Sequence, residues 1–280
     1  MDGTRNGAGN EQWDQDSLAA VAVGDVLGGT VTAVRAYRDA SVALDGCAGP
    51  PLGEIVSQDL SWRRSAEAVL RVGQRITAEV VSVDRENARI RLSTAATENP
   101  ELWRFLKGRC PGELVSGTIA SIESFGVFVA LDEGPGHPVF PGVGFVSHSG
   151  LSWCTVRHAT EIVSVGERVR CEFLAFDTWN GEARLSLRAT RPDPFQSFAD
   201  RTEVGRQVRG RIVKLAPIGA FAEITVGVVG LIPLRELPEA PVTDPEDLVR
   251  VGDEVTAVVT TLERERRRFT LSMRQVSGGR

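Results

Sequence analysis

Short runs in which apolar and polar residues alternate recur along the chain, and they predict β-strands rather than long helices. In the stretch SFGVFVAL, residues 124–131, every second residue from position 127 onward is aliphatic, as on the buried face of a strand. Phe128 lies between these positions and is therefore expected to point toward solvent. Phe125 is three residues earlier, so a regular strand would place it on the opposite face. Gly126 permits a bulge, which is predicted to move Phe125 to the outer face beside Phe128.

One sequence pattern occurs three times along the chain. The segments VLRVGQRITAEVVSVDRENARIRLS, IVSVGERVRCEFLAFDTWNGEARLSL and LVRVGDEVTAVVTTLERERRRFTLS each carry a Val-Gly pair, and each glycine precedes a matching serine by twenty residues. The three glycines are Gly73, Gly166 and Gly252. The steps of 93 and 86 residues between them are the size of a small domain and too long for a solenoid repeat.

Each copy predicts five short strands and one helical connection. The last two strands of each copy form a hairpin with a polar or charged turn, and Asn180-Gly181 in the second copy is a strong hairpin signal. Five short strands in about 75 residues fit a small closed barrel of the OB type, which leaves no exposed sheet edge. The predicted fold class is therefore all-β, with three tandem five-stranded OB-fold barrels joined by short helical linkers.

The residues that follow the third strand carry a family resemblance. The stretch WCTVRHATEIVSVGERV, residues 153–169, resembles the W-x-x-V-x-H-P-x-E-x-V-x-V-G-x-x-V block of the S1 RNA-binding domain. The two linkers also resemble the joints between consecutive domains of the bacterial ribosomal protein S1 family, and the resemblance covers about residues 21–276. The expected segments are a flexible acidic tail at residues 1–20, a first copy at 21–96, a linker at 97–111, a second copy at 112–190, a linker at 191–203 and a third copy at 204–276.

The second copy is predicted to bind RNA with its exposed aromatic residues. OB barrels bind single strands on the face of their second and third strands, where bases stack on aromatic rings. Phe125 and Phe128 would form such a stacking platform, with Arg157 and His158 at its rim for phosphates. The alternative is that Phe125 caps the barrel core and Phe128 alone is exposed.

The position of His148 is open at this stage. The family usually shows G-L-x-H-I-S here, whereas this chain reads GFVSHSG, so Ser147 takes the place of the family's histidine. His148 then falls where a buried isoleucine would be. Either the strand shifts locally, which the preceding long insert DEGPGHPVFPGVG would permit, and His148 reaches the RNA, or the contact is lost.

The third and first copies depart further from the pattern. In the third, PIGAFAEI keeps Phe221 at the second aromatic position, while Ile218 replaces the first. We expect weaker stacking there and more phosphate contact, from Lys214, Arg211 and Arg235. The first copy keeps Tyr37 near the first aromatic position, but Ser41 replaces the second. It resembles the degenerate leading domain of the family, which implies docking to the small ribosomal subunit through residues 1–96.

Composition and charge limit the mode of binding. The net charge is −5, and the second copy carries five basic and nine acidic residues, which argues against nucleic-acid binding by bulk electrostatics. Binding must therefore come from local geometry and stacking. No apolar run is long enough to span a membrane, and the first twenty residues lack the features of a signal peptide, so a cytoplasmic protein without a membrane partner is expected.

No catalytic motif is recognisable, and the four cysteines show no metal-type spacing, so no enzyme activity, metal or cofactor is expected. The leading hypothesis is a monomeric, non-catalytic protein that binds single-stranded RNA, in particular mRNA, in translation. The alternative is a ribosome-associated docking adaptor or regulator whose barrels mainly bind protein.

Overall fold

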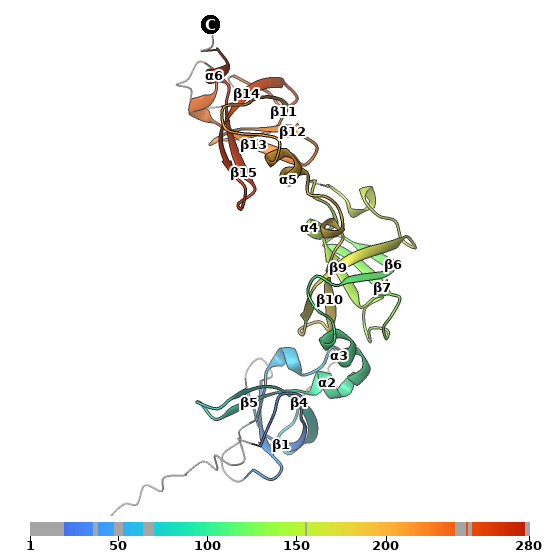
Figure 1. Cartoon of the computed structure of the whole chain (residues 1–280). Helices are drawn as coiled ribbons and strands as arrows, with labels where there is room; N and C mark the ends of the chain where they lie inside the picture. Colours follow the sequence, from blue (N-terminus) through green and yellow to red (C-terminus); the bar gives the residue numbers. More distant parts are fainter. Residues whose placement is uncertain are drawn as a thin grey trace, which may run out of the picture.

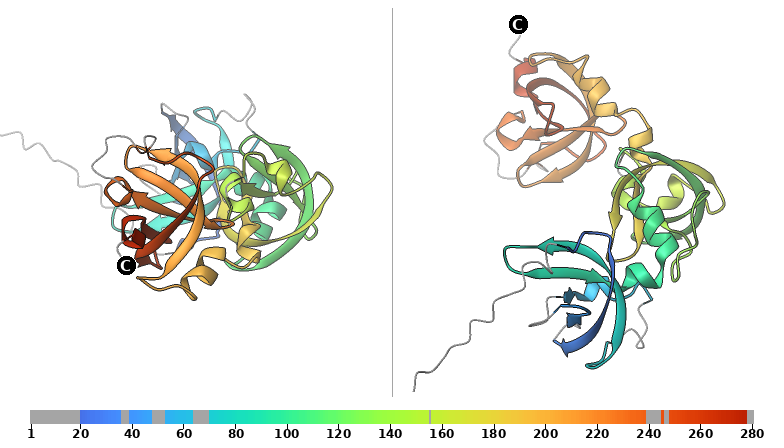
Figure 2. Two further views of the ribbon diagram at one scale, coloured as in Figure 1. Left: turned by 90° about the horizontal axis from the view of Figure 1, so that it is seen from above. Right: turned by 60° about the horizontal axis from the view of Figure 1, so that its bottom comes forward.

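A computed structural model describes residues 20–35, 39–47, 53–63, 70–154, 156–238, 245 and 248–277. Three β-barrels follow one another along the chain, and short helices lie between them (Figures 1 and 2). Each barrel is closed by five strands, so the predicted fold class is confirmed. The tail up to residue 19 and Tyr37 of the first copy lie outside the described residues.

The strands and helices follow the same order in each barrel. The first barrel and the linker after it comprise β1 (Val26–Val34), β2 (Ala40–Leu44), β3 (Gly53–Ile55), η2 (Ser57–Asp59), β4 (Arg75–Asp84), β5 (Arg89–Ser93), α2 (Thr94–Glu98) and α3 (Pro100–Lys107). The second barrel and its linker comprise β6 (Leu114–Glu123), β7 (Gly126–Leu131), β8 (Gly144–Ser147), α4 (His148–Leu151), η4 (Ala159–Glu161), β9 (Arg168–Asp177), β10 (Glu182–Ser186), η5 (Arg188–Thr190) and α5 (Pro194–Ala199). The third comprises β11 (Gln207–Ala216), β12 (Gly219–Thr225), β13 (Val228–Pro233), η6 (Leu234–Glu236), β14 (Glu254–Glu263), β15 (Arg268–Ser272) and α6 (Arg274–Ser277).

A bulge in the first strand of each barrel helps to close it. The first strand pairs with the second through one half and with the fourth through the other, while the third and fifth strands pair in parallel. The register shifts at the same place in every copy, between Val31 and Ala33, Ile119 and Ser121, and Ile212 and Lys214. A bulge increases the local bend and twist of a strand, which lets one long strand serve two neighbours in a small barrel.

The period-two alternation places the aliphatic side chains inside each barrel. In β7, Val127 and Val129 are at most 1% exposed and belong to the core of the second barrel, together with Phe173 of β9. Each barrel has a core of its own, and Trp62 of the first barrel is buried with the core of the second. None of the helices in the described part of the chain is long and apolar enough to cross a bilayer.

The linker helices pack on the barrel that follows them. Both begin with a proline, Pro100 in α3 and Pro194 in α5, whose fixed φ suits the first turn of a helix. Trp103 of α3 is buried with the core of the second barrel. Phe195 and Phe198 of α5 are buried with the core of the third. Each of these two helices is therefore anchored to the barrel that follows it.

Trp62 joins the first barrel to the second. It follows η2 of the first barrel, and it is 2% exposed because its ring packs among residues of the second barrel and of α3. Its Nε1–H donates a hydrogen bond to the carbonyl oxygen of Thr178 at 2.9 Å. The ring lies against Gly181 so closely that a Cβ there would approach it to 2.4 Å. Gly181 also has φ +72, so this hairpin position requires glycine for two reasons.

Candidate nucleic-acid interface

The strand register places three equivalent residues across the outer face of each barrel, on its second, third and fifth strands. The row reads Phe128, Phe145 and Arg184 in the second copy, Phe221, Leu231 and Thr270 in the third, and Ser41, Glu54 and Arg91 in the first. The second copy thus has two aromatic rings and a cation, the third has one ring, and the first has none. Aromatic rings on this face are the feature on which stacking of bases depends.

Phe125 is exposed, but for a different reason from the predicted one. Its side chain is 59% exposed, so the alternative in which it caps the barrel core is wrong. No bulge separates it from β7: Glu123 pairs with Gly126, and Phe125 belongs to the two-residue turn between β6 and β7. A Cβ at Gly126 would lie 2.4 Å from the carbonyl oxygen of Val146, so this close approach requires glycine.

Phe128 is buried, and its predicted exposure is therefore wrong. It lies on the outer face as the alternation indicated and takes no part in the barrel core, yet it is only 4% exposed. Phe140, from the insertion between β7 and β8, stacks on it with ring centroids 5.0 Å apart and an angle of 19° between the planes. Phe145 of β8 contacts it from the side at 5.3 Å. Of the predicted pair, Phe125 alone is open to solvent.

Phe145 and Arg184 belong to this face, although neither was predicted as a binding residue. The ring of Phe145 lies 5.7 Å from that of Phe125, and the guanidinium of Arg184 lies over it at 4.9 Å. Nε of Arg184 also donates to Oδ2 of Asp177 at 2.9 Å, which fixes the cation beside the ring. The sequence offered one signal for Arg184, because it stands at an outward position of the last strand, two residues before the repeated serine.

His148 and Arg157 lie together in an open groove beside the second joint. The groove is lined by His148, Ser149, Ser152, Trp153, Cys154, Val156, Arg157 and Arg188. Strand β8 does not shift: Ser147 pairs with Gly126, as Pro233 pairs with Gly219 in the third copy. Ser147 therefore keeps the position of the family's histidine, and His148 begins α4 with its backbone N–H donating to the carbonyl oxygen of Phe125 at 3.4 Å.

Two arginines converge on Trp153 at the edge of this groove. The guanidiniums of Arg188 and Arg267 lie 4.8 Å and 4.4 Å from the indole, and Arg267 comes from the hairpin of the third barrel. Burial and the neighbouring Arg188 lower the pKa of Arg267. Asp193 is its ion-pair partner, whereas Arg157 and Arg188 form no ion pair among the described residues. The groove therefore has cations available for an anionic ligand.

His158 is held in a local structure. Its backbone carbonyl oxygen accepts a hydrogen bond from the backbone N–H of Glu161 at 3.1 Å, and the carboxylate of Glu161 accepts one from the backbone N–H of His158 at 2.9 Å. This reciprocal arrangement caps the short helix η4. Both bonds use backbone atoms of His158, so the phosphate contact of its side chain stays a prediction.

The outer face of the third barrel brings two predicted residues together. The ammonium of Lys214 lies 5.8 Å from the ring of the half-buried Phe221, and Ile218 is 61% exposed in the turn that corresponds to that of Phe125. The other two predicted residues are paired with carboxylates: Arg211 with Glu254 at 3.2 Å and Arg235 with Glu236 at 3.7 Å. This copy thus has one aromatic ring on its outer face, and the weaker stacking predicted for it stays a prediction.

The first barrel has a polar, partly acidic outer face. Ser41 and Glu54 stand where the second barrel has Phe128 and Phe145, and Arg35 pairs with Glu54 at 3.7 Å. The described part of this face offers no surface for stacking of bases.

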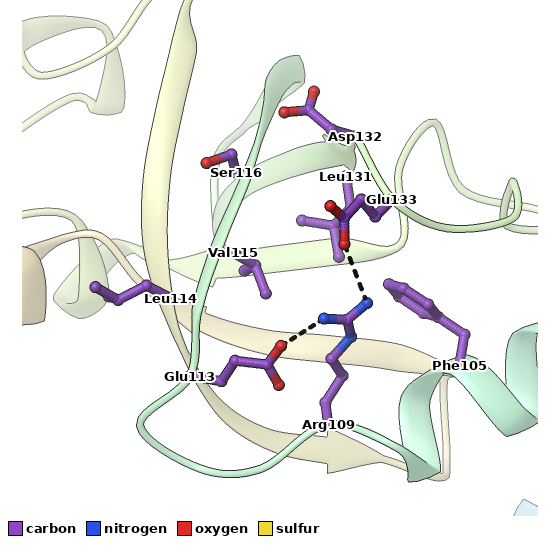
Figure 3. Close-up of a pocket in the computed structure, with 9 residues that line it drawn as sticks. All are labelled: Phe105, Arg109, Glu113, Leu114, Val115, Ser116, Leu131, Asp132 and Glu133. Atoms are coloured by element: carbon purple, nitrogen blue, oxygen red, sulfur yellow. Dashed lines mark hydrogen bonds and ion pairs between the residues drawn. The ribbon is translucent and has the colours of Figure 1, made fainter.

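A well-formed pocket beside α3 has the wrong charge for a nucleic acid. Figure 3 shows Arg109 reaching between Glu113 and Glu133, with its guanidinium 4.4 Å from the ring of Phe105. Asp132 also lines the pocket, so its carboxylates outnumber its cation. This excess of negative charge disfavours binding of a polyanion. Among the described residues, no group of three acidic, histidine or cysteine side chains is placed to hold a metal ion.

Comparison with known proteins gives one family and several relatives. The S1 RNA binding domain matches residues 20–95, 111–188 and 201–274. The small ribosomal subunit protein bS1 of Mycolicibacterium smegmatis is 34% identical over 223 residues, which are 78% of this chain and 45% of that protein. The bS1 protein of Chlamydia trachomatis is 28% identical over 236 residues, 81% of this chain and 40% of that protein. This chain therefore spans about half the length of the curated relatives that it matches.

Proposed function

The chain belongs to the S1 RNA-binding domain family, and from this premise we propose that it is a non-catalytic protein that binds single-stranded RNA, mRNA in particular, during translation. The names of its relatives support a role at the small ribosomal subunit. We also propose a cytoplasmic location. We propose a monomer in which successive barrels contact one strand, so that weak sites gain affinity through their effective concentration.

The exposed ring of Phe125 carries this proposal. It stands at the open end of the Phe128–Phe145 aromatic cluster, and a base stacked on it would lie next to Arg184. The groove with His148, Arg157 and Arg188 begins at the neighbouring backbone and leads toward the third barrel. We propose that the strand stacks on Phe125 and that its phosphates follow this groove. Because many arginines already have carboxylate partners, binding should depend only weakly on salt.

Phe125→Ala is expected to weaken binding of a single-stranded RNA by about 1–3 kcal/mol, because one stacked base loses its ring. Fluorescence anisotropy with a labelled oligouridylate measures the change, and a duplex RNA of equal length should bind weakly to both proteins. Trp179→Ala is the matched control, since Trp179 is also exposed, at 54%, but lies on the β9–β10 hairpin. Equal losses in both variants, or none in Phe125→Ala, would contradict the proposed site.

A second candidate function rests on the outer face of the first barrel. Since Ser41 and Glu54 replace the aromatic residues there, we propose that this barrel contacts protein of the small subunit rather than RNA. The full chain is then expected to co-sediment with small subunits even when excess oligouridylate fills the RNA sites. Complete release by the oligonucleotide would show that RNA alone holds the chain on the ribosome.

A further inference from the structure

The insertion between β7 and β8, residues 132–143, covers the outer face of the second barrel. Phe140 lies nearly parallel to Phe128 at 5.0 Å, and His137 stacks on Phe140 at 4.7 Å with 30° between the planes. Trp62 of the first barrel continues this stack, 6.3 Å from His137 at an angle of 28°. The two rings of the insertion thus occupy the space that stacked nucleobases would take on Phe128.

The third barrel has no such cover. Its strands β12 and β13 are joined by a two-residue turn, because Thr225 pairs with Val228. The equivalent ring, Phe221, contacts the Lys214 ammonium and stays half-exposed. The covered aromatic face is therefore a property of the insertion and not of the barrel itself.

Hydrogen bonds of His137 hold the insertion in its closed position. Nδ1 accepts hydrogen bonds from the backbone N–H groups of Val139 and Phe140, at 3.1 Å and 2.9 Å. These partners assign the ring proton to Nε2, which donates to the carbonyl oxygen of Asn180 at 2.8 Å. The imidazole is therefore neutral. Burial lowers the pKa of His137, which also favours the neutral form. One side chain thus connects the turn that carries Phe140 to the β9–β10 hairpin.

A polar atom is buried beside Phe128. Ser121 pairs with Phe128 across β6 and β7, and its hydroxyl is buried without a hydrogen-bond partner among the described residues. A buried polar group without a partner is unfavourable. The contacts that oppose opening are ring stacking and the bonds of His137, all of them noncovalent and close to the surface. A ligand that stacks on Phe128 would compensate for their loss.

We propose that the insertion is an intramolecular competitor of RNA, in which Phe140 fills a nucleobase subsite on Phe128 until a single strand displaces it. This inference rests on the proposed function. The apparent affinity for RNA is then the affinity of the open form multiplied by the fraction of molecules in which the insertion is open. Because His137 also stacks on Trp62, opening removes a contact at the first joint, and RNA binding is coupled to the placement of the first barrel.

Phe140→Ala is expected to bind a labelled oligouridylate about tenfold more tightly than the wild-type chain, as removal of a competing closed state requires. Adding Phe128→Ala should abolish this gain, because the freed subsite is lost. Val139→Ala is the matched control: Val139 lies in the same turn, is 51% exposed, and should leave the affinity unchanged. An unchanged affinity in Phe140→Ala would overturn the proposal, and a weaker affinity would instead make Phe140 part of the binding surface.

Hydrogen exchange of the full wild-type chain provides a second measurement that needs no variant. The amides of Val139 and Phe140 should be protected in the free protein and lose protection when the oligouridylate saturates it. Persistent protection at saturation would overturn the inference. If the wild type binds through Phe125 but Phe140→Ala binds no more tightly, the result contradicts only the proposed competition by the insertion. If neither protein binds single-stranded RNA, both the competitor and the proposed function fail.

Discussion

Replacing Trp62 with alanine is expected to destabilise the first joint by about 3–5 kcal/mol, the usual cost of removing a buried tryptophan. The indole belongs to the first barrel, yet its ring lies 6.0 Å from that of Trp103 and 6.2 Å from that of Phe176, both outside that barrel. Truncation would leave a cavity between the barrels, and the carbonyl oxygen of Thr178 would lose its hydrogen-bond donor. The joint, rather than either barrel core, should fail first.

Calorimetry of the full chain measures this effect. In the wild type, the first two barrels should unfold in one coupled transition, and in Trp62→Ala the first barrel should melt separately at a lower temperature. The control is Trp153→Ala at the second joint, where the indole is half-exposed and contacts the two guanidiniums of Arg188 and Arg267. That variant should cost less. A single unchanged transition in Trp62→Ala would mean that the first joint contributes little to stability.

Arg91→Ala is expected to destabilise the first barrel by a similar amount, about 3–5 kcal/mol, because it leaves a buried carboxylate without its cation. Asp59 is 1% exposed, and its Oδ2 accepts a hydrogen bond from Nε of Arg91 at 2.6 Å. Its other oxygen has no partner among the described residues. Denaturant titration of the full chain, followed by circular dichroism, measures the loss at neutral pH.

The pH dependence of this loss follows from the direction of the shift. Burial raises the pKa of Asp59 above 3.8, and the bond from Arg91 opposes that rise. Without Arg91, the pKa of Asp59 in the folded protein rises further. The folded variant therefore takes up a proton at a higher pH than the unfolded chain does. The destabilisation is therefore present above the folded pKa and is relieved as the pH falls through it. The difference in the free energy of unfolding between Arg91→Ala and the wild type should therefore narrow as the pH falls from neutral to about 4.

Two further variants separate a buried charge from a simple loss of packing. Asp59→Asn together with Arg91→Ala should recover most of the stability, since no unpaired charge remains. Arg75→Ala removes the arginine of an exposed ion pair in the same barrel, whose partner Asp45 is 50% exposed. It should cost much less than Arg91→Ala, because ion pairs between exposed side chains contribute little to stability. Equal losses in Arg91→Ala and Arg75→Ala would contradict this reasoning.

The barrel fold could be predicted from sequence because its determinants are local and repeated. Alternation of aliphatic residues with period two identifies a strand and its buried face within a few residues, as in Val127 and Val129. Three copies of the Val-Gly and serine spacing then limited the number of strands and the hairpin positions. Each copy supplied independent support for the same five-stranded unit, so an error in one strand would not have altered the conclusion.

The candidate site was predicted only in part. The alternation correctly assigned Phe128 to the outer face, but it could not indicate that Phe140, twelve residues later in an irregular segment, would lie on top of it. The turn that exposes Phe125 was mistaken for a bulge, since both use glycine at the same place. The family resemblance raised the question of His148, and the register answered it, with Ser147 at the expected position.

By itself, the sequence determined three closed barrels, their order, and the side of each strand that faces the core, because these depend on the pattern of neighbouring residues. Only the tertiary structure decided which aromatic rings meet solvent and which residues form the joints. Trp62 donates to the carbonyl of Thr178, 116 residues away, and Phe128 is covered by a loop without periodicity. Exposure depends on everything that packs on a side chain, and no local pattern records contacts made across the chain.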